Sequence, residues 1–238
     1  MILGVLKEIK PQENRVCMTP AGVDLIKGHG HEVYVEKNAG VGSGFEDIKY
    51  IEAGATILDS PAEVYEISDM VMHVKEPQPS EFGYIKKGQI VFTYLHLASD
   101  KNLTDELLKT GSIGIAYETI EGRNRSLPLL APMSEVAGRL ATQQGAKYLE
   151  RTFGGRGLLM GGVPGTPRSN VLVIGGGVVG INAAQIACGM GANVKILDMS
   201  IDRLRYLSDV MPANCTPLMS SPAMIKELAK EADLVIGA

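Results

Sequence analysis

The 238-residue chain contains 45% hydrophobic and 21% charged residues, which is ordinary for a globular protein and allows one large domain or two smaller ones. A net charge of −4 gives no reason to expect nucleic acid or an acidic membrane surface as a partner. The longest apolar runs, such as residues 171–174, are far too short to span a membrane. We therefore expect a globular protein that binds neither nucleic acid nor a membrane.

Three cysteines, Cys17, Cys188 and Cys215, are widely separated, and the sequence has no His/Cys cluster at metal-ligand spacing. We expect no metal site and reduced thiols. The first twelve residues contain no long apolar core ahead of a small-residue cleavage site, so we expect no signal peptide. Both features favour a cytoplasmic protein.

Short apolar, β-branched runs alternate with helical patterns along the chain, which is typical of parallel βαβ units. One helix is expected to begin near Thr19 and Pro20, because threonine caps a helix and proline fits its first turn. Another helix is expected over residues 134–151. The sequence thus predicts an α/β protein with two Rossmann-like parallel-sheet domains, the second of them incomplete. The runs predict strands at residues 2–5, 33–35, 70–74, 90–95, 113–116, 171–174, 194–197 and 234–236.

Two stretches interrupt this alternation. Residues 124–134 carry two prolines, and residues 152–170 hold six glycines and two prolines. Because such compositions are typical of domain boundaries, we expect a first domain over 1–128 and a second over 169–238. The intervening segment 129–168 is expected to be a connecting helix and a glycine-rich flap.

The strongest local motif is "VLVIGGGVVGINAAQIACGMGANVKILD", in which Gly175, Gly177 and Gly180 form G-x-G-x-x-G between a strand and a helix. The first glycine permits a tight turn, the second lets a pyrophosphate approach the backbone, and the third lets helix and strand pack closely. The free N–H groups of the helix N-terminus, beginning at Val178 and Val179, favour a bound phosphate. This pattern predicts a dinucleotide site.

Asp198 lies 23 residues beyond Gly175, at the end of the next predicted strand. A carboxylate there accepts hydrogen bonds from a ribose 2′-OH and repels a 2′-phosphate, which favours NAD over NADP. Arg203 lies close enough to hold a 2′-phosphate and complicates this preference. A simple helix-capping role for Asp198 is the alternative.

Two other glycine clusters do not fit the motif. "AGVGSGF" (39–45) follows a strand but has Phe45 where the third glycine is required, and "GGRG" (154–157) follows a helix. We interpret both as turns or a flap.

Polar residues also follow several predicted strands of the first domain. Arg15 lies in the loop after the first strand, and Lys75, His96 and Glu118 each follow a later strand. In a parallel sheet all four fall at the carboxyl edge, facing one crevice where a ligand can bind. Arginine can grip a carboxylate with two hydrogen bonds, and histidine can exchange a proton near neutral pH. Solvated charges, an ordinary structural histidine and a simple Glu118 ion pair are the alternatives.

The other histidines, His29, His31 and His73, have no such placement, and we expect His73 to point to one face of a strand.

At this point the sequence resembles the alanine dehydrogenase family. The similarity runs from Gly4 to Asp198. It rests on "GVLKEIKPQENRVCMTPAGV", "VKEPQPSE", "TYLHLASD", "AYETIE", "APMSEVAGRLATQQGAKYLE" and the glycine-loop segment. The resemblance implies reversible, NAD-dependent oxidative deamination of L-alanine to pyruvate and ammonia by a homo-oligomer, a hexamer in the family.

Carried over by position, the resemblance implies that Arg15 and Lys75 hold the substrate and that His96 is an acid/base, with Lys75 also able to polarise a carbonyl. The cofactor-binding residues it implies, together with those of the glycine loop, are Ser134, Gly175, Gly177, Val178, Val179, Gly180, Asp198, Arg203 and Ser220.

Two other functions stay open. One is a non-catalytic nucleotide-binding module, and the other is a subunit similar to the alpha subunit of proton-translocating transhydrogenase. That family shares the "RV…TP" opening but lacks the Lys and His placed as Lys75 and His96 are here.

The region after Ser169 supplies about the first half of a dinucleotide domain. In the family a later loop adds a catalytic aspartate and further nicotinamide contacts, and a helical return follows. We therefore expect little or no dehydrogenase activity from this chain alone, and an uncovered apolar face at its last strand.

Overall fold

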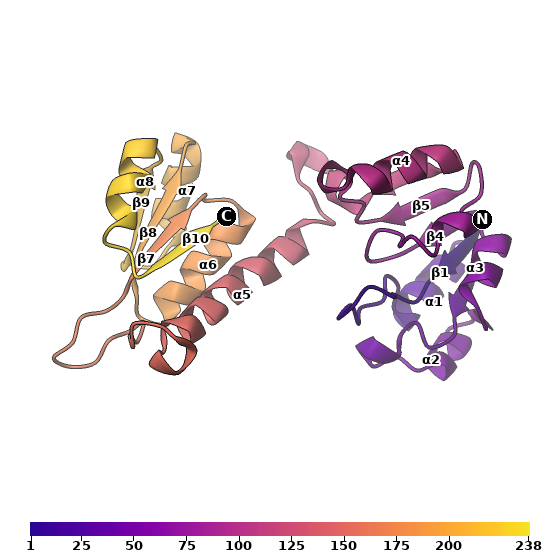
Figure 1. The fold of residues 1–238 in the computed structure, drawn as a ribbon, viewed down its shortest axis with the longest axis horizontal. Coiled ribbons are helices and arrows are strands. Elements are labelled where there is room, and N and C mark those ends of the chain that lie inside the picture. Colours follow the sequence, from indigo (N-terminus) through magenta and orange to yellow (C-terminus); the bar gives the residue numbers. More distant parts are fainter. The chain divides into compact units, whose positions relative to one another are not determined.

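The computed structural model describes the backbone of residues 1–238 and every side chain except that of Asn124. The chain divides into two compact units, Met1–Leu129 and Leu130–Ala238 (Figure 1). The segment 129–168, expected to connect two domains, thus lies almost entirely within the second unit.

The first unit is built on a six-stranded sheet in the order β3-β2-β1-β4-β5-β6, and all of its strand pairs are parallel. This is the doubly wound order, in which the direction of progression reverses between β1 and β4. The strands are β1 (Ile2–Val5), β2 (Glu32–Glu36), β3 (Thr56–Leu58), β4 (Met70–Met72), β5 (Ile90–Thr93) and β6 (Ile113–Ala116).

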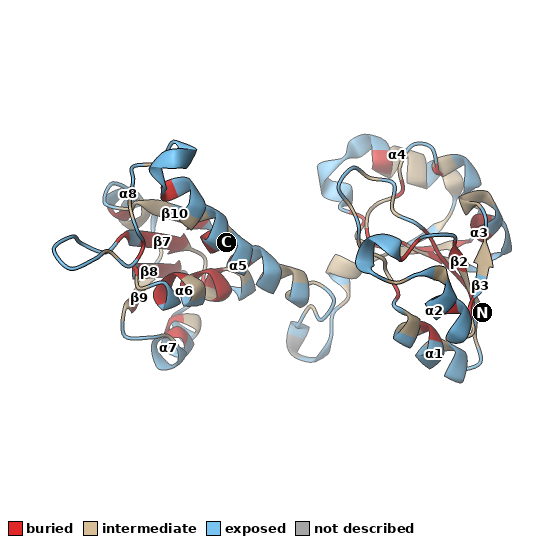
Figure 2. Ribbon diagram, turned by 90° about the horizontal axis from the view of Figure 1, so that it is seen from below, coloured by how far each residue is buried: buried red, intermediate tan, exposed pale blue. Residues whose placement is uncertain are grey.

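Four α-helices cover the two faces of this sheet: α1 (Pro20–Gly28), α2 (Asp47–Glu52), α3 (Pro61–Ile67) and α4 (Lys101–Thr110). Val23 of α1 and Tyr50 of α2 are buried in one apolar cluster, whereas Val64 of α3 lies in the other. As expected, Thr19 caps α1 by accepting from the N–H of Gly22, with Pro20 in the first turn. The buried residues concentrate in the strands and on the inner helix faces (Figure 2).

The second unit has a four-stranded parallel sheet in the order β10-β7-β8-β9, which repeats the first four positions of the doubly wound order. Its strands are β7 (Asn170–Ile174), β8 (Asn193–Asp198), β9 (Cys215–Met219) and β10 (Leu234–Gly237). Its α-helices are α5 (Ala131–Leu149), α6 (Val178–Gly189), α7 (Ile201–Val210) and α8 (Pro222–Ala229).

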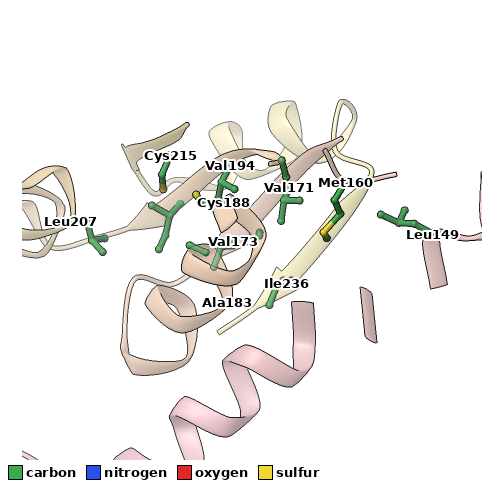
Figure 3. Packing of buried hydrophobic residues seen from close by; sticks show 14 of the residues in the cluster. Leu149, Met160, Val171, Val173, Ala183, Cys188, Val194, Leu207, Cys215 and Ile236 are labelled. Atoms are coloured by element: carbon green, nitrogen blue, oxygen red, sulfur yellow. The ribbon is translucent and has the colours of Figure 1, made fainter. Parts of the chain in front are cut away.

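The second unit has two apolar clusters: a larger one that includes residues of the sheet and α6, and a smaller one that joins the sheet to Leu228 of α8. Val171, Val173 and Val194 of the strands pack against Ala183 of α6, as Figure 3 shows. Helix α5 packs along α6: the hydroxyl of Thr142 donates to the Ala183 carbonyl at 2.8 Å. A long helix that looks like a connection in the sequence is therefore part of this unit.

The structure adds two strands that the sequence analysis did not predict. β3 has only three residues, and β9 contains Pro217, a residue that argues against a strand. Both are edge strands of their sheets, where short length and proline are tolerated.

Several predicted boundaries were wrong; among them, the helix predicted over 134–151 ends at Leu149. The strands predicted at 70–74 and 90–95 end at Met72 and Thr93, because the chain leaves the sheet there. The helix predicted from residue 134 begins at Ala131, with Pro132 in its first turn. Among the described helices, none combines the length and apolar character needed to cross a membrane.

Candidate functional site

A cavity of about 410 Å³ lies at the carboxyl edge of the first sheet. Its lining includes Arg15, from the loop after β1, and Val74, from the loop after β4. Since β1 and β4 are neighbours at the point where the strand order reverses, the cavity sits where doubly wound sheets bind ligands. Phe92 and Tyr94 add an apolar wall that suits a small organic molecule.

The guanidinium of Arg15 is held by Glu13. Arg15 donates from Nε to Glu13 Oε1 at 2.8 Å and from Nη2 to Oε2 at 2.6 Å. This pair lowers the pKa of Glu13 to about 2, chiefly through the side-chain hydrogen bond, and raises the pKa of Arg15. Glu13 therefore fixes a permanently charged arginine at the cavity wall.

Lys75 directly follows the cavity-lining residue Val74. Its backbone is held on both sides, because its N–H donates to Glu8 Oε1 at 3.2 Å and its carbonyl accepts from Thr93 Oγ1 at 2.7 Å. Sequence reasoning had no role for Glu8 or Thr93.

His96 lines a different cavity, of about 370 Å³, together with Glu118. Its backbone is left-handed, with φ of 49°, and its N–H donates to Glu118 Oε1 at 2.7 Å. Arg15 and His96 were expected to face one crevice, but they line separate cavities. Tyr94 lines the first cavity and stacks on the ring of His96 at a centroid distance of 6.0 Å.

Glu118 was expected at this edge with either a functional role or an ion pair. Its carboxylate accepts the backbone N–H groups of Leu95, at 3.3 Å, and His96. It orders the loop that carries the histidine.

A buried polar cluster centred on His73 escaped the sequence analysis. The His73 ring is 2% exposed, with Nδ1 3.5 Å from Glu8 Oε1 and Nε2 3.0 Å from the hydroxyl of Tyr65. Glu81 Oε1 lies 3.6 Å from Nε2, and burial raises the pKa of Glu81. The one feature of the sequence that could have indicated this cluster was the position of His73, two residues before Lys75.

The second unit places its glycine loop between β7 and α6. Gly175 has φ of +106°, a conformation that side chains rarely adopt, and Gly177 is the N-cap of α6. A Cβ on Gly180 would lie 1.8 Å from the Gly175 carbonyl oxygen, so only glycine lets the helix approach the loop. Val178 and Val179 begin the helix, where N–H groups lack carbonyl partners. This backbone fits a pyrophosphate.

Asp198 ends β8 and braces the glycine loop. Its Oδ2 accepts the Gly176 N–H at 2.9 Å, and its Oδ1 accepts the Ser200 N–H at 2.8 Å. Arg203 donates from Nε to the Gly176 carbonyl and from Nη2 to the Gly177 carbonyl at 3.4 Å. Both side chains lie against the loop, and each carboxylate oxygen retains a lone pair for a further donor.

The remaining predicted cofactor residues lie at different positions of the second unit. Ser220 follows β9, and its N–H donates to the Asp198 carbonyl at 2.9 Å. Ser134 lies in the first turn of α5. Among the described side chains, no group of three or more His, Cys, Asp or Glu is arranged to hold a metal ion.

The fold of both units and the glycine loop of the second define the structural class of this protein. Both units are Rossmann-like α/β structures, and the second has the glycine loop and strand-end acid of a dinucleotide-binding fold.

Comparisons with known proteins agree with this class. Residues 4–137 match the model of the alanine dehydrogenase/PNT N-terminal domain, and residues 141–238 match that of the C-terminal domain. The chain therefore belongs to the alanine dehydrogenase/PNT family.

Individual relatives support the same assignment. The chain is 53% identical to an alanine dehydrogenase of Methanococcus maripaludis over 100% of its own length and 64% of that protein. A solved L-alanine dehydrogenase structure matches 99% of this chain and 65% of that chain, with a TM-score of 0.89 and 48% identity. A transhydrogenase structure from Sinorhizobium meliloti shares the fold, with a TM-score of 0.81 and 24% identity. The chain spans less than two thirds of the length of the curated relatives it matches.

Proposed function

We propose that this chain carries the substrate and cofactor sites for the reversible, NAD-dependent oxidative deamination of L-alanine to pyruvate and ammonia. The observation that carries the proposal is the cavity of about 410 Å³, where Arg15 adjoins an apolar wall. A fixed guanidinium beside apolar side chains matches a small acid with a short apolar side chain. The family resemblance further supports a cytoplasmic homo-oligomer, a hexamer.

At the substrate site, Arg15 binds the carboxylate and Lys75 holds the same acid or polarises its carbonyl. Converting an amine to a carbonyl requires protons to leave nitrogen and water, and His96 is the residue proposed to accept and return them. Tyr94, stacked on His96, supports that ring.

At the cofactor site, the backbone from Gly175 to Gly180 holds the pyrophosphate and Asp198 accepts from the ribose hydroxyls. Bound NAD would supply the acceptor for the hydride that leaves Cα of alanine. Arg203 already donates to the carbonyls of Gly176 and Gly177, which favours a bracing role for it over capture of a 2′-phosphate. Ser134, Val178, Val179 and Ser220 complete the proposed set.

The first experiment measures NADH and pyruvate binding to the 238-residue chain, followed by NADH formation from L-alanine and NAD at alkaline pH. The proposal expects binding of both ligands, and NADH formation is a separate readout on which it does not depend. NADH binding without pyruvate binding would favour a nucleotide-binding module instead. A folded chain that binds neither ligand would contradict the proposal.

Cofactor choice is tested with Asp198→Gly. Removing the carboxylate is expected to reduce the preference for NADH over NADPH by about tenfold, since its repulsion of a 2′-phosphate is lost. Asp202→Gly, in the exposed first turn of α7, is the matched control and should keep the preference. An unchanged preference in Asp198→Gly would refute the ribose role.

A further inference from the structure

The loop that carries Lys75 leaves the sheet just before the cavity. β4 pairs with β1 and β5 only as far as Met72, and the last ladder hydrogen bond runs from the His73 N–H to the Phe92 carbonyl at 3.2 Å. Beyond it, the backbone groups of Val74 and Lys75 need other partners, because an unpaired buried backbone group is costly.

Side chains from both neighbouring strands supply those partners. From the β1 side, Glu8 Oε1 accepts the N–H groups of Val74, at 2.5 Å, and Lys75, at 3.2 Å. From the β5 side, Thr93 Oγ1 donates to the Lys75 carbonyl at 2.7 Å. The peptide units on both sides of the Lys75 Cα are therefore held by side chains.

Both holding groups are themselves fixed. Thr93 is the last residue of β5 and is fully buried, so its hydroxyl has little freedom. The Glu8 side chain is 5% exposed and lies 3.5 Å from Nδ1 of His73, whose side chain is 2% exposed. The Tyr65 hydroxyl, 3.0 Å from Nε2, holds the opposite side of that ring.

From this geometry we propose that Glu8 and Thr93 are positioning residues for Lys75 and set the direction in which its side chain reaches substrate. The inference rests on the proposed function, in which Lys75 binds the acid. Thr93 is buried and acts through Lys75, and Glu8 acts through backbone N–H groups. Displacing a substrate-binding group by about 1 Å can cost roughly a hundredfold in rate, so a backbone clamp of this kind affects function.

The test compares Thr93→Val with Thr93→Ser in the 238-residue chain. Valine keeps the shape and removes only the hydroxyl, whereas serine keeps the hydroxyl. Pyruvate affinity, followed by the line width of its methyl resonance, is expected to fall about tenfold in Thr93→Val. It should return to within about twofold of the unmodified chain in Thr93→Ser. NADH affinity should be unchanged in both, since the glycine loop lies in the other unit.

A double-mutant cycle separates positioning from a general structural role. In a Lys75→Gln background, Thr93→Val should cause no further loss of pyruvate affinity, because no ammonium remains to be positioned. Independent, additive losses would overturn the proposal. If Lys75→Gln leaves no measurable affinity, the valine and serine comparison decides: equal affinities in the two Thr93 variants and the unmodified chain would overturn it.

Glu8 gives a second route if Thr93→Val does not fold. Glu8→Ala leaves the two N–H groups without this acceptor and should lower pyruvate affinity about tenfold, while Glu8→Gln keeps an accepting oxygen and should lose less. A folded Glu8→Ala chain with unchanged affinity would overturn the proposal. If the unmodified, folded chain itself fails to bind pyruvate, the proposed function fails first.

Discussion

The two units share one strand order, but the loops at the carboxyl edges of their sheets are held in different ways. In the second unit, the loop after β7 is shaped by backbone: Gly175 with positive φ, Gly177 at the helix start and Gly180 against the strand. In the first unit, the loops after β1, β4 and β5 are held by side chains such as Glu8, Glu13 and Glu118. The same fold thus has a backbone loop suited to binding phosphate in one unit and a network of charged side chains in the other.

The sharpest way to break the backbone site is Gly180→Ala. The new Cβ would lie 1.8 Å from the Gly175 carbonyl oxygen, so helix or loop must move. We expect a loss of about 3 kcal/mol or more in unfolding free energy of the second unit and at least a hundredfold loss of NADH affinity. Chemical denaturation and NADH fluorescence titration measure the two effects.

Gly189→Ala is the matched control on the same helix. Gly189 ends α6, is exposed, and a Cβ there would meet nothing within 4 Å. Alanine should be neutral or stabilise by about 0.5 kcal/mol. Equal effects of the two substitutions would show that close packing at Gly180 does not shape the site.

The same difference explains what the sequence could predict. A backbone site leaves a residue pattern, because only glycine tolerates the geometry at Gly175 and Gly180, and the spacing to Asp198 is local. Eight of the ten parallel strands were also readable from their apolar runs. The assignments of Arg15, Lys75 and His96 to binding and catalysis stay predictions.

The side-chain network was not predictable in this way. Glu8 meets Lys75 across 67 positions of sequence, and Glu118 meets His96 across 22. Such contacts depend on which strands become neighbours, and no residue type marks them in advance. Likewise, β9 was not predicted because it contains Pro217. Proline is tolerated in a strand that pairs on one side only, and the sequence alone does not show that β9 is such a strand.

In the first unit, the largest expected effect comes from Arg15→Lys. Lysine keeps the positive charge but not the planar fork that pairs with both Glu13 oxygens at 2.8 and 2.6 Å. Pyruvate affinity should fall by about 2 kcal/mol, roughly thirtyfold, with NADH affinity unchanged. Arg205→Lys, on the exposed surface of α7, should change neither affinity. Unchanged pyruvate affinity in Arg15→Lys would show that the guanidinium contributes nothing to pyruvate binding beyond its positive charge.

The Glu13–Arg15 pair should also make stability depend on pH. The Glu13 side chain is 9% exposed, and its pKa falls from 4.5 to about 2 on account of the Arg15 hydrogen bond. A lowered carboxyl pKa stabilises the folded state above the ordinary value, and that stabilisation is lost as pH falls from about 4.5 to about 2. Because Arg15 is 40% exposed, solvent screening limits the gain to about 1 kcal/mol.

Glu13→Gln is therefore expected to lower the unfolding free energy of the first unit at pH 7 and to have progressively less effect toward pH 2. Urea titrations across this range measure the difference. Glu106→Gln, which removes an exposed pair with Lys109, should change stability by less than about 0.5 kcal/mol at each pH. A Glu13→Gln effect that does not vary with pH would contradict the linkage.

The smallest expected effect on pyruvate affinity comes from removing a single hydrogen bond at the carboxyl edge of the first sheet. The Tyr94 hydroxyl donates to the Leu129 carbonyl at 2.5 Å, while its ring lines the cavity and stacks on His96. Tyr94→Phe keeps the ring and removes one neutral hydrogen bond, so pyruvate affinity should fall about fivefold or less. Tyr94→Leu removes the stacking as well and should cost more.

If Tyr94→Phe and Tyr94→Leu weakened binding equally, the hydroxyl alone would account for the role of Tyr94. If Tyr94→Phe cost as much as Arg15→Lys, the network would behave as one cooperative unit rather than as separate contacts. At the glycine loop we expect no intermediate losses of affinity, because there is no room for any Cβ at Gly180. We therefore expect substitutions at Arg15 and Tyr94 to lower pyruvate affinity, and those at Glu13 to lower stability, by amounts that depend on the contact removed. Substitution of Gly180 should instead abolish tight NADH binding in one step.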